Sequence, residues 1–224
     1  MAADSPSALV VSCMSHRCGI MVSTGNASFE LIYTAGAGDT LDAVAGGTER
    51  SRLFITGEVV IWRCTEANAK WQTEHDGRIP QRCDMQLTTS ADGESAATFT
   101  RPTQCSTPGV WTAQIDNASL ASVTLDRITM RRAGSFMVLA TGRSKDAPAD
   151  GAYFNVGLYK NAGATLVLLA QAVTSAAGQN PLAANGRMLS FVADDYLVYQ
   201  FRSLAGSLGL LLDQCWFSVQ EVLP

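Results

Sequence analysis

The side chains that could hold a metal ion or activate a nucleophile are few and badly spaced in this chain. His16 lies between Cys13 and Cys18, and the second histidine, His75, stands in a Glu-His-Asp-Gly stretch. A structural zinc site needs four ligands at tighter spacing than these residues offer. Neither histidine has a neighbouring nucleophile pattern that would make it a catalytic base. We therefore expect no metal, no cofactor, no catalytic residue and no enzymatic activity, and we expect the His75 stretch to be a polar turn.

The six cysteines could in principle form three disulfides: Cys13, Cys18, Cys64, Cys83, Cys105 and Cys215. Their connectivity cannot be derived from spacing, and no Cys-x-x-Cys occurs. The segment before Val10 carries Asp4 and neither Lys nor Arg, which is unlike a signal peptide. We therefore expect reduced, buried thiols.

One glycine-rich stretch could bind a phosphate. Gly36-Ala37-Gly38-Asp39 resembles the Gly-Ala-Gly-Asp signature of ribokinase-type sugar kinases. In that family the resemblance implies an anion-binding helix N-terminus and an aspartate that serves as catalytic base. There the motif follows a complete α/β nucleotide-binding domain. Here only about 35 residues of β-type pattern precede it, so we expect a loop between strands.

The acidic pair Asp194-Asp195 could bind calcium, since carboxylates are ligands that this ion prefers. A single aspartate pair between two apolar runs is more typical of a β-turn. We expect a turn.

Composition narrows the class of protein. Hydrophobic residues make up 47% and charged residues 16%, which is too apolar for a disordered chain. The longest apolar run lies around Ala164–Ala170, far short of the roughly 20 residues that span a bilayer. The net charge is −4 and the basic residues are scattered, so we expect neither nucleic-acid nor membrane binding.

In the segments that must position these residues, apolar and polar residues alternate with a period of two. Short runs rich in Val, Ile, Thr, Phe and Tyr alternate with Gly, Asn, Asp and Pro clusters, which is typical of a sandwich or barrel. Only Thr40–Ala45 and Gly206–Leu212 have helical character. Two prolines and little apolar content indicate a loop around residues 102–109. We therefore predict an all-β chain with an irregular N-terminal anchoring domain over 1–101, a linker over 102–109 and a second β domain over 110–224.

The second half resembles the tumour-necrosis-factor and complement globular-head family. Four segments carry the resemblance, in the family's order: Ile128–Val138, Val156–Gly163, Leu189–Tyr199 and Cys215–Val222. Asp194 stands where the family prefers glycine, and Ala162 is inserted before Gly163. The resemblance implies a jelly-roll sandwich that assembles as a homotrimer. Its expected core comprises Phe136, Val138, Val156, Leu158, Leu189, Phe191, Trp216 and Phe217.

The strand Tyr196–Phe201 is apolar on both faces, and a strand of this kind is buried on both sides. One face packs on the opposite sheet, so we expect a second subunit to cover the other face. The aromatic residues expected at the trimer interface are Tyr153, Tyr159, Tyr199 and Phe201.

Three functions remain open. The first is a non-enzymatic virion structural protein, a trimeric capsid decoration or head-spike protein on a bacteriophage, with the major capsid protein or another virion protein as partner. Low charge and an N-terminal β domain ahead of a trimeric head favour it. The second is a tail-fibre or receptor-binding module for host glycans, for which Trp71 is the best aromatic residue. The third is a secreted cytokine-like ligand, which the absence of an evident signal peptide disfavours. We expect the virion as location.

Overall fold

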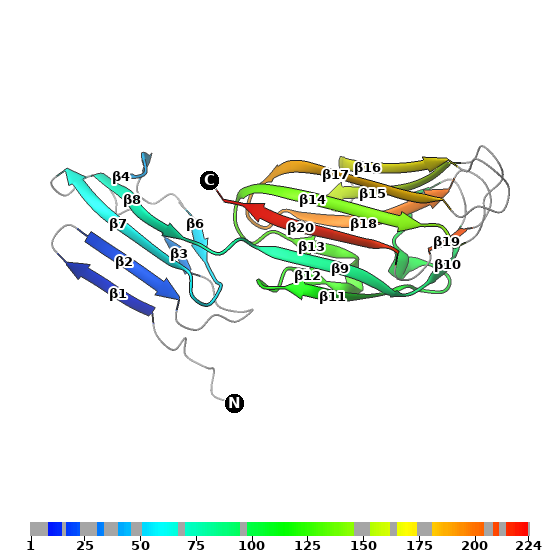
Figure 1. Cartoon of the computed structure of the whole chain (residues 1–224), viewed down its shortest axis with the longest axis horizontal. Helices are drawn as coiled ribbons and strands as arrows, with labels where there is room; N and C mark the ends of the chain where they lie inside the picture. The colour runs from blue at the N-terminus through cyan, green and yellow to red at the C-terminus, as the bar shows by residue number, and fades with distance from the viewer. Residues whose placement is uncertain are drawn as a thin grey trace, which may run out of the picture. The chain divides into compact units, whose positions relative to one another are not determined.

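The protein is all-β, as predicted, and forms two compact units (Figure 1). The computed structural model describes residues 9–14, 17–22, 31–33, 40–45, 51–66, 70–94, 98–145, 153–161, 165–173, 181–203, 208–210 and 214–223. Unit 1 lies within Met1–Pro80 and unit 2 within Gln81–Val222. Helical structure in the described residues is confined to two 3₁₀ turns, η1 (Pro102–Gln104) and η2 (Val123–Leu125). None of the described helices has the length and apolar content needed to cross a membrane.

Unit 1 is built on a six-stranded sheet with the order β1-β2-β7-β8-β4-β5, beside the two-stranded pair β3-β6. Alternation explains the longest strands: on β7, Val60 and Trp62 are buried while Arg63 is exposed. The strands of this unit are β1 (Leu9–Met14), β2 (Arg17–Val22), β3 (Leu31–Tyr33), β4 (Thr40–Leu41), β5 (Val44–Ala45), β6 (Ser51–Leu53), β7 (Val59–Glu66) and β8 (Lys70–Gly77).

The segment expected to have helical character, Thr40–Ala45, is instead the β4–β5 hairpin. Asp42 and Ala43 form its two-residue turn, both with positive φ (49° and 66°), as the common hairpin turns require. The Asp42 carboxylate fixes the turn by accepting hydrogen bonds from the Thr73 backbone N–H (2.7 Å) and hydroxyl (2.6 Å). The helix N-terminus that a kinase motif needs is therefore not formed over 40–45. Asp39 lies outside the described residues.

Unit 2 is a sandwich of two five-stranded sheets. We call the sheet β11-β9-β20-β14-β17 the front sheet and the sheet β12-β13-β18-β15-β16 the back sheet. A short pair, β10-β19, completes the unit. Of the second segment with helical character, Gly206–Leu212, the described residues Leu208–Leu210 form strand β19. The strands are β9 (Arg82–Thr89), β10 (Ala91–Glu94), β11 (Val110–Asp116), β12 (Ala121–Ser122), β13 (Arg127–Thr129), β14 (Gly134–Arg143), β15 (Tyr153–Lys160), β16 (Thr165–Val173), β17 (Leu182–Phe191), β18 (Tyr196–Ser203), β19 (Leu208–Leu210) and β20 (Trp216–Val222).

The strand pairing of unit 2 is that of a jelly roll. Four antiparallel pairs are nested in the sequence, from the inside outward: β15 with β16, β14 with β17, β13 with β18 and β9 with β20. Successive pairs alternate between the back and the front sheet. A long antiparallel ribbon wrapped in this way forms the eight-stranded double-sheet jelly roll.

The boundary between the units falls at Pro80, earlier than the linker expected over 102–109. β9 lies between β11 and β20 in the front sheet, so residues from Arg82 onward belong to the sandwich. The expected linker is packed structure: Pro102 and Cys105 are buried, and the Gly109 N–H donates to the Pro102 carbonyl (2.9 Å). Proline and low apolar content indicated a loop correctly but not its burial.

Candidate interaction surface

Tyr199 and Phe201, expected at a subunit interface, lie inside the sandwich. Their exposed fractions are 0% and 2% in a single chain, so a second subunit cannot reach them. The Tyr199 ring packs against Trp111 and Phe217 with ring centroids 5.1 and 5.5 Å away. Its hydroxyl donates to the Thr141 carbonyl (2.8 Å), which satisfies the one polar group that the ring brings into the core. Burial raises the pKa of Tyr199 well above its ordinary value.

Part of the outer face of the back sheet is covered by the chain's own segment around Phe99. Thr100 exchanges two backbone hydrogen bonds with Phe201, each 2.9 Å, and so extends the sheet beside β18. Phe99 then packs edge-on against Tyr159, at 5.3 Å between ring centroids, and under the Arg202 guanidinium at 4.5 Å. Gly157 makes room, because a Cβ there would lie 2.9 Å from the Phe99 ring.

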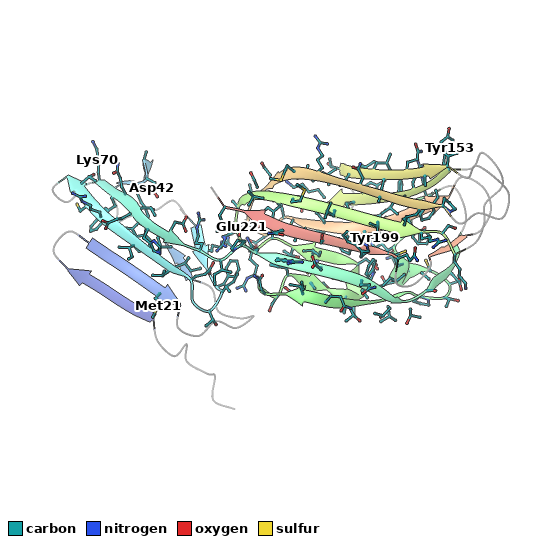
Figure 2. The ribbon with its side chains drawn as sticks, viewed as in Figure 1. Met21, Asp42, Lys70, Tyr153, Tyr199 and Glu221 are labelled. Atoms are coloured by element: carbon teal, nitrogen blue, oxygen red, sulfur yellow. The ribbon has the colours of Figure 1, made fainter. Side chains whose placement is uncertain are left out.

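The packing of Phe99 shows that a segment of the same chain covers part of this outer face beside β18. Alternation predicted burial on both sides; on the outer side Val198 is buried, whereas Tyr196 and Gln200 are half-buried. It could not identify what buries the outer side, because Phe99 is about 100 residues away in sequence. The glycine within the apolar run of β15 was the available signal, since a strand glycine often marks close approach of another group. Tyr153 remains exposed (Figure 2) and Tyr159 is half-buried.

A buried carboxylate anchors the covering segment. Asp126, in the left-handed conformation with φ 53°, accepts hydrogen bonds from the Trp111 indole N–H (2.5 Å), the Thr103 N–H (3.2 Å) and the Thr103 hydroxyl. Thr103 belongs to η1, and Asp126 follows η2. Burial raises the pKa of the Asp126 carboxyl, against the opposing effect of these hydrogen bonds.

The front sheet presents an apolar outer face in the described part of the chain. Met137 and Leu139 on β14 are 40% and 36% exposed, and Met188 on β17 is 44% exposed. Met137 pairs in register with Met188, and Leu139 pairs with Gly186. The Leu139 side chain lies over Gly186, where a Cβ would come within 2.3 Å of it. Val222, also exposed, ends β20 on the same sheet. We call Met137, Leu139, Met188 and Val222 the front patch.

A polar hollow adjoins the front patch on the same sheet. It has a volume of about 470 Å³ and is lined by Arg82, Asp84, Met85, Gln86, Gln114, Leu139, Trp216 and Ser218. Arg82 and Asp84 form an ion pair at 2.8 Å. The front sheet thus carries an apolar half over β14 and β17 and a polar half over β9.

Trp216 lies half-exposed in this hollow, although the sequence placed it in the core. Trp216 and Phe217 are neighbours on β20 and must point to opposite faces. Phe217 takes the inner position, against Trp111 at 5.3 Å. Leu189, on the edge strand β17, is also half-exposed. The structure buries the other six predicted core residues: Phe136, Val138, Val156, Leu158, Phe191 and Phe217.

The acidic pair forms a turn whose carboxylate is already occupied. Asp194 takes the left-handed conformation (φ 69°) that the missing glycine would favour. Asp195 accepts from the Lys160 ammonium (2.6 Å), the Asn161 amide (2.6 Å) and the Val192 N–H (2.8 Å). Burial acts to raise the pKa of Asp195, but these donors outweigh it and the pKa is lowered. Among the described residues, no group of three or more His, Cys, Asp or Glu is arranged to hold a metal.

Three cysteines of unit 2 are buried thiols: Cys83, Cys105 and Cys215. Burial raises the pKa of Cys215 to about 12 and that of Cys83 still further. Cys64, in unit 1, is partly exposed. His75 lies exposed on β8 rather than in a turn, and Trp71 on the same strand is half-buried. His16 lies outside the described residues.

The sequence matches no known protein-family profile and no curated protein. Solved structures similar to the chain include murine APRIL at pH 8.0, with 7% identity and a TM-score of 0.47, covering 64% of this chain and 100% of that one. Eiger TNF from S. frugiperda has 11% identity and a TM-score of 0.48, covering 65% and 94%. The globular domain of zebrafish complement 1qA protein has 10% identity and a TM-score of 0.41, covering 63% and 95%. The jelly-roll assignment itself rests on the nested strand pairs.

Proposed function

We propose that the chain is a non-enzymatic, self-associating β module, a homotrimer whose subunits meet through the outer face of the front sheet. The observation that carries the proposal is the front patch, in which Met137, Leu139 and Met188 are neighbours on one sheet face and Val222 lies on the same face, paired with Ser135. Contiguous exposed apolar patches on soluble domains commonly mark interaction sites. The number three comes from the family resemblance of the second half.

The division of the front sheet into two halves fits a cyclic assembly. In a ring, each subunit offers two different regions, one to each neighbour. The apolar front patch and the polar hollow with its Arg82–Asp84 ion pair are two such regions on one sheet. On the other sheet, Phe99 and Tyr159 pack over part of the outer face, while Tyr153, Leu166, Leu169 and Val173 stay exposed on β15 and β16, so a variant on that sheet serves as the comparison.

Two matched leucine variants of the full chain test the surface. Leu139→Asp places a charge within the front patch, whereas Leu169→Asp places it on β16 of the back sheet, where the leucine is equally exposed (36% against 38%). We expect Leu139→Asp to sediment as a monomer and Leu169→Asp to sediment like the unchanged protein. Equal behaviour of the two variants would remove the front patch from the interface.

We further propose that the trimer serves a virion, as a capsid decoration or head-spike protein on a bacteriophage, bound to the major capsid protein or another virion protein. Support comes from the low charged fraction of 16% and from the separate β unit 1, which could act as an anchor. Purified protein should bind purified capsids, and removal of unit 1 should abolish that binding. A trimer that does not bind capsids would contradict the virion role but not the proposed self-association.

The hollow around Trp216 favours one alternative, recognition of a host glycan. An indole face beside a carboxylate, a guanidinium and two amides can stack on a sugar ring and bind its hydroxyls. Trp216 is better placed for this than Trp71. The test is tryptophan fluorescence on addition of polysaccharide. A change in the unchanged protein that is absent in Trp216→Phe would support this alternative. Because the hollow adjoins the front patch, binding to the assembled protein would also count against burial of this face.

A further inference from the structure

The front patch contains a pair of methionines that differ in exposure from the other methionines of unit 2. Met137 and Met188 are 40% and 44% exposed, whereas Met85 and Met130 are 0% exposed. Met137 and Met188 lie directly opposite each other on β14 and β17. Side chains opposite each other in an antiparallel pair have Cβ atoms about 5 Å apart. The two thioethers therefore occupy one spot on the sheet.

Exposed thioethers react with peroxides. In that reaction the methionine sulfur gives up two electrons and gains one oxygen atom, the peroxide O–O bond breaks, and hydrogen peroxide leaves as water. The product, methionine sulfoxide, is polar where methionine was apolar. Solvent access controls the rate, so Met137 and Met188 are open to this reaction and Met85 and Met130 are shielded from it.

Oxidation of Met137 or Met188 changes the polarity of the apolar patch around them. Leu139 follows two residues after Met137 on the same face and lies flat over Gly186, two residues before Met188. A sulfoxide on either methionine puts a strong hydrogen-bond acceptor into this apolar patch. Burying such a group against a partner without a donor costs free energy, because its hydrogen bonds to water are lost and not replaced. Two sulfoxides at one spot add their effects.

We propose that Met137 and Met188 form a modification site at which oxidation of the free subunit by hydrogen peroxide blocks self-association. The inference rests on the proposed function, since it assigns the front patch to a second copy of the chain. It goes beyond that function in making assembly sensitive to oxidation. Reduction of the sulfoxides by a methionine sulfoxide reductase restores the apolar patch and with it the assembly.

The test uses the full chain, hydrogen peroxide and three proteins: unchanged, Met137→Leu/Met188→Leu, and Met21→Leu as control. Met21 is 41% exposed but belongs to unit 1. Dilute protein is oxidised, mapped by peptide mass spectrometry, and then concentrated and sedimented. We expect oxygen at Met137 and Met188 well before Met85 and Met130, and self-association weakened about tenfold or more, equivalent to about 1.4 kcal/mol. The Met21→Leu protein should respond like the unchanged one, and the double leucine variant should assemble after oxidation.

Each other outcome overturns a defined part of the inference. If Met85 or Met130 is oxidised as fast as Met137 and Met188, the selective site does not exist. If oxidation is selective but assembly is unchanged, the block of assembly is refuted while the proposed self-association stands. If the untreated protein is already a monomer at high concentration, self-association itself fails, and the oxidation-sensitive assembly fails with it.

Discussion

The hydroxyl of Tyr199 on β18 donates a 2.8 Å hydrogen bond to the carbonyl of Thr141 on β14, and so joins the two sheets across the core. The same ring packs against Trp111 and Phe217. Tyr199, which the sequence placed at a subunit interface, therefore lies in the core of the sandwich of one chain. Met137 and Leu139 are exposed on the outer face of the front sheet, and the proposed subunit contact lies there.

Substitutions of Tyr199 should change the stability of the fold rather than assembly. Tyr199→Phe keeps the ring and loses one hydrogen bond, so we expect a loss of about 1 kcal/mol in the free energy of unfolding. Tyr199→Asp buries a charge without a partner and should leave little folded protein. Urea denaturation followed by circular dichroism measures both. A well-folded Tyr199→Asp monomer would instead indicate that the side chain lies at an interface.

The buried ion pair between Arg132 and Glu221 should be costly to break. The two side chains are 0% and 2% exposed, 2.7 Å apart, and Gln81 adds a backbone hydrogen bond to Glu221 (3.0 Å). We expect Glu221→Gln to lower the free energy of unfolding by about 3–5 kcal/mol, because Arg132 keeps a buried charge.

The exposed pair Arg82–Asp84, also in unit 2, serves as the control for this variant. Its side chains are 46% and 26% exposed, and Arg82→Met should cost about 0–1 kcal/mol. Equal losses for the two variants in urea denaturation would show that burial does not govern the strength of these pairs.

Asp126 and Asp195 should affect the pH dependence of stability in opposite ways. The folded-state pKa of Asp126 is raised above its ordinary value of 3.8, so the stability linked to this group is fully present below pH 3.8 and is lost as pH rises through the folded pKa. The stability of Asp126→Asn relative to the unchanged protein should therefore rise between about pH 4 and pH 7. Asparagine also tolerates the positive φ at this position. Melting temperatures at the two pH values measure this gain.

The folded-state pKa of Asp195 is lowered below 3.8, so its stability is present above that pH and is lost as pH falls through the folded pKa. Asp195→Asn should be less stable than the unchanged protein at pH 7, and the deficit should shrink only below about pH 4. For each variant, the difference in stability from the unchanged protein is followed against pH. If both differences changed in the same direction as pH rises, the two carboxylates would not have opposite environments.

The buried cysteines should resist thiol reagents in the folded protein. Burial raises the pKa of Cys215 to about 12, and thiolate is the reactive form. At pH 8 iodoacetamide should label Cys64 well before Cys83, Cys105 and Cys215, and all four should react in urea. Peptide mapping after timed labelling gives the order. Early labelling of Cys215 would show that the sandwich opens around β20.

Period-two patterning was sufficient to predict an all-β chain, and the resemblance to predict the jelly roll. Alternation also told which residues of β14 face inward, as Phe136 and Val138 do. It failed where the two faces are similar: on β20, Trp216 and Phe217 are both aromatic, and nothing local decides which one lies inside. The domain boundary was misplaced because β9 pairs with β20, more than 130 residues later. Long-range pairings of this kind, like the packing of Phe99 on Gly157, leave no periodic signal.

The candidate surface could not be located from sequence for the same reason. Nothing in the sequence distinguishes Met137, Leu139 and Met188 from other strand residues, because their exposure depends on how the two sheets pack. Gly186 was a usable sign in retrospect, since Leu139 occupies the space that a side chain there would take.

Sedimentation equilibrium of the full, unchanged chain decides whether the protein forms trimers. A single chain has a mass of 23.8 kDa. At micromolar concentration we expect a species of three times that mass, which Leu139→Asp converts to single chains. A stable monomer of 23.8 kDa over the whole concentration range would contradict it.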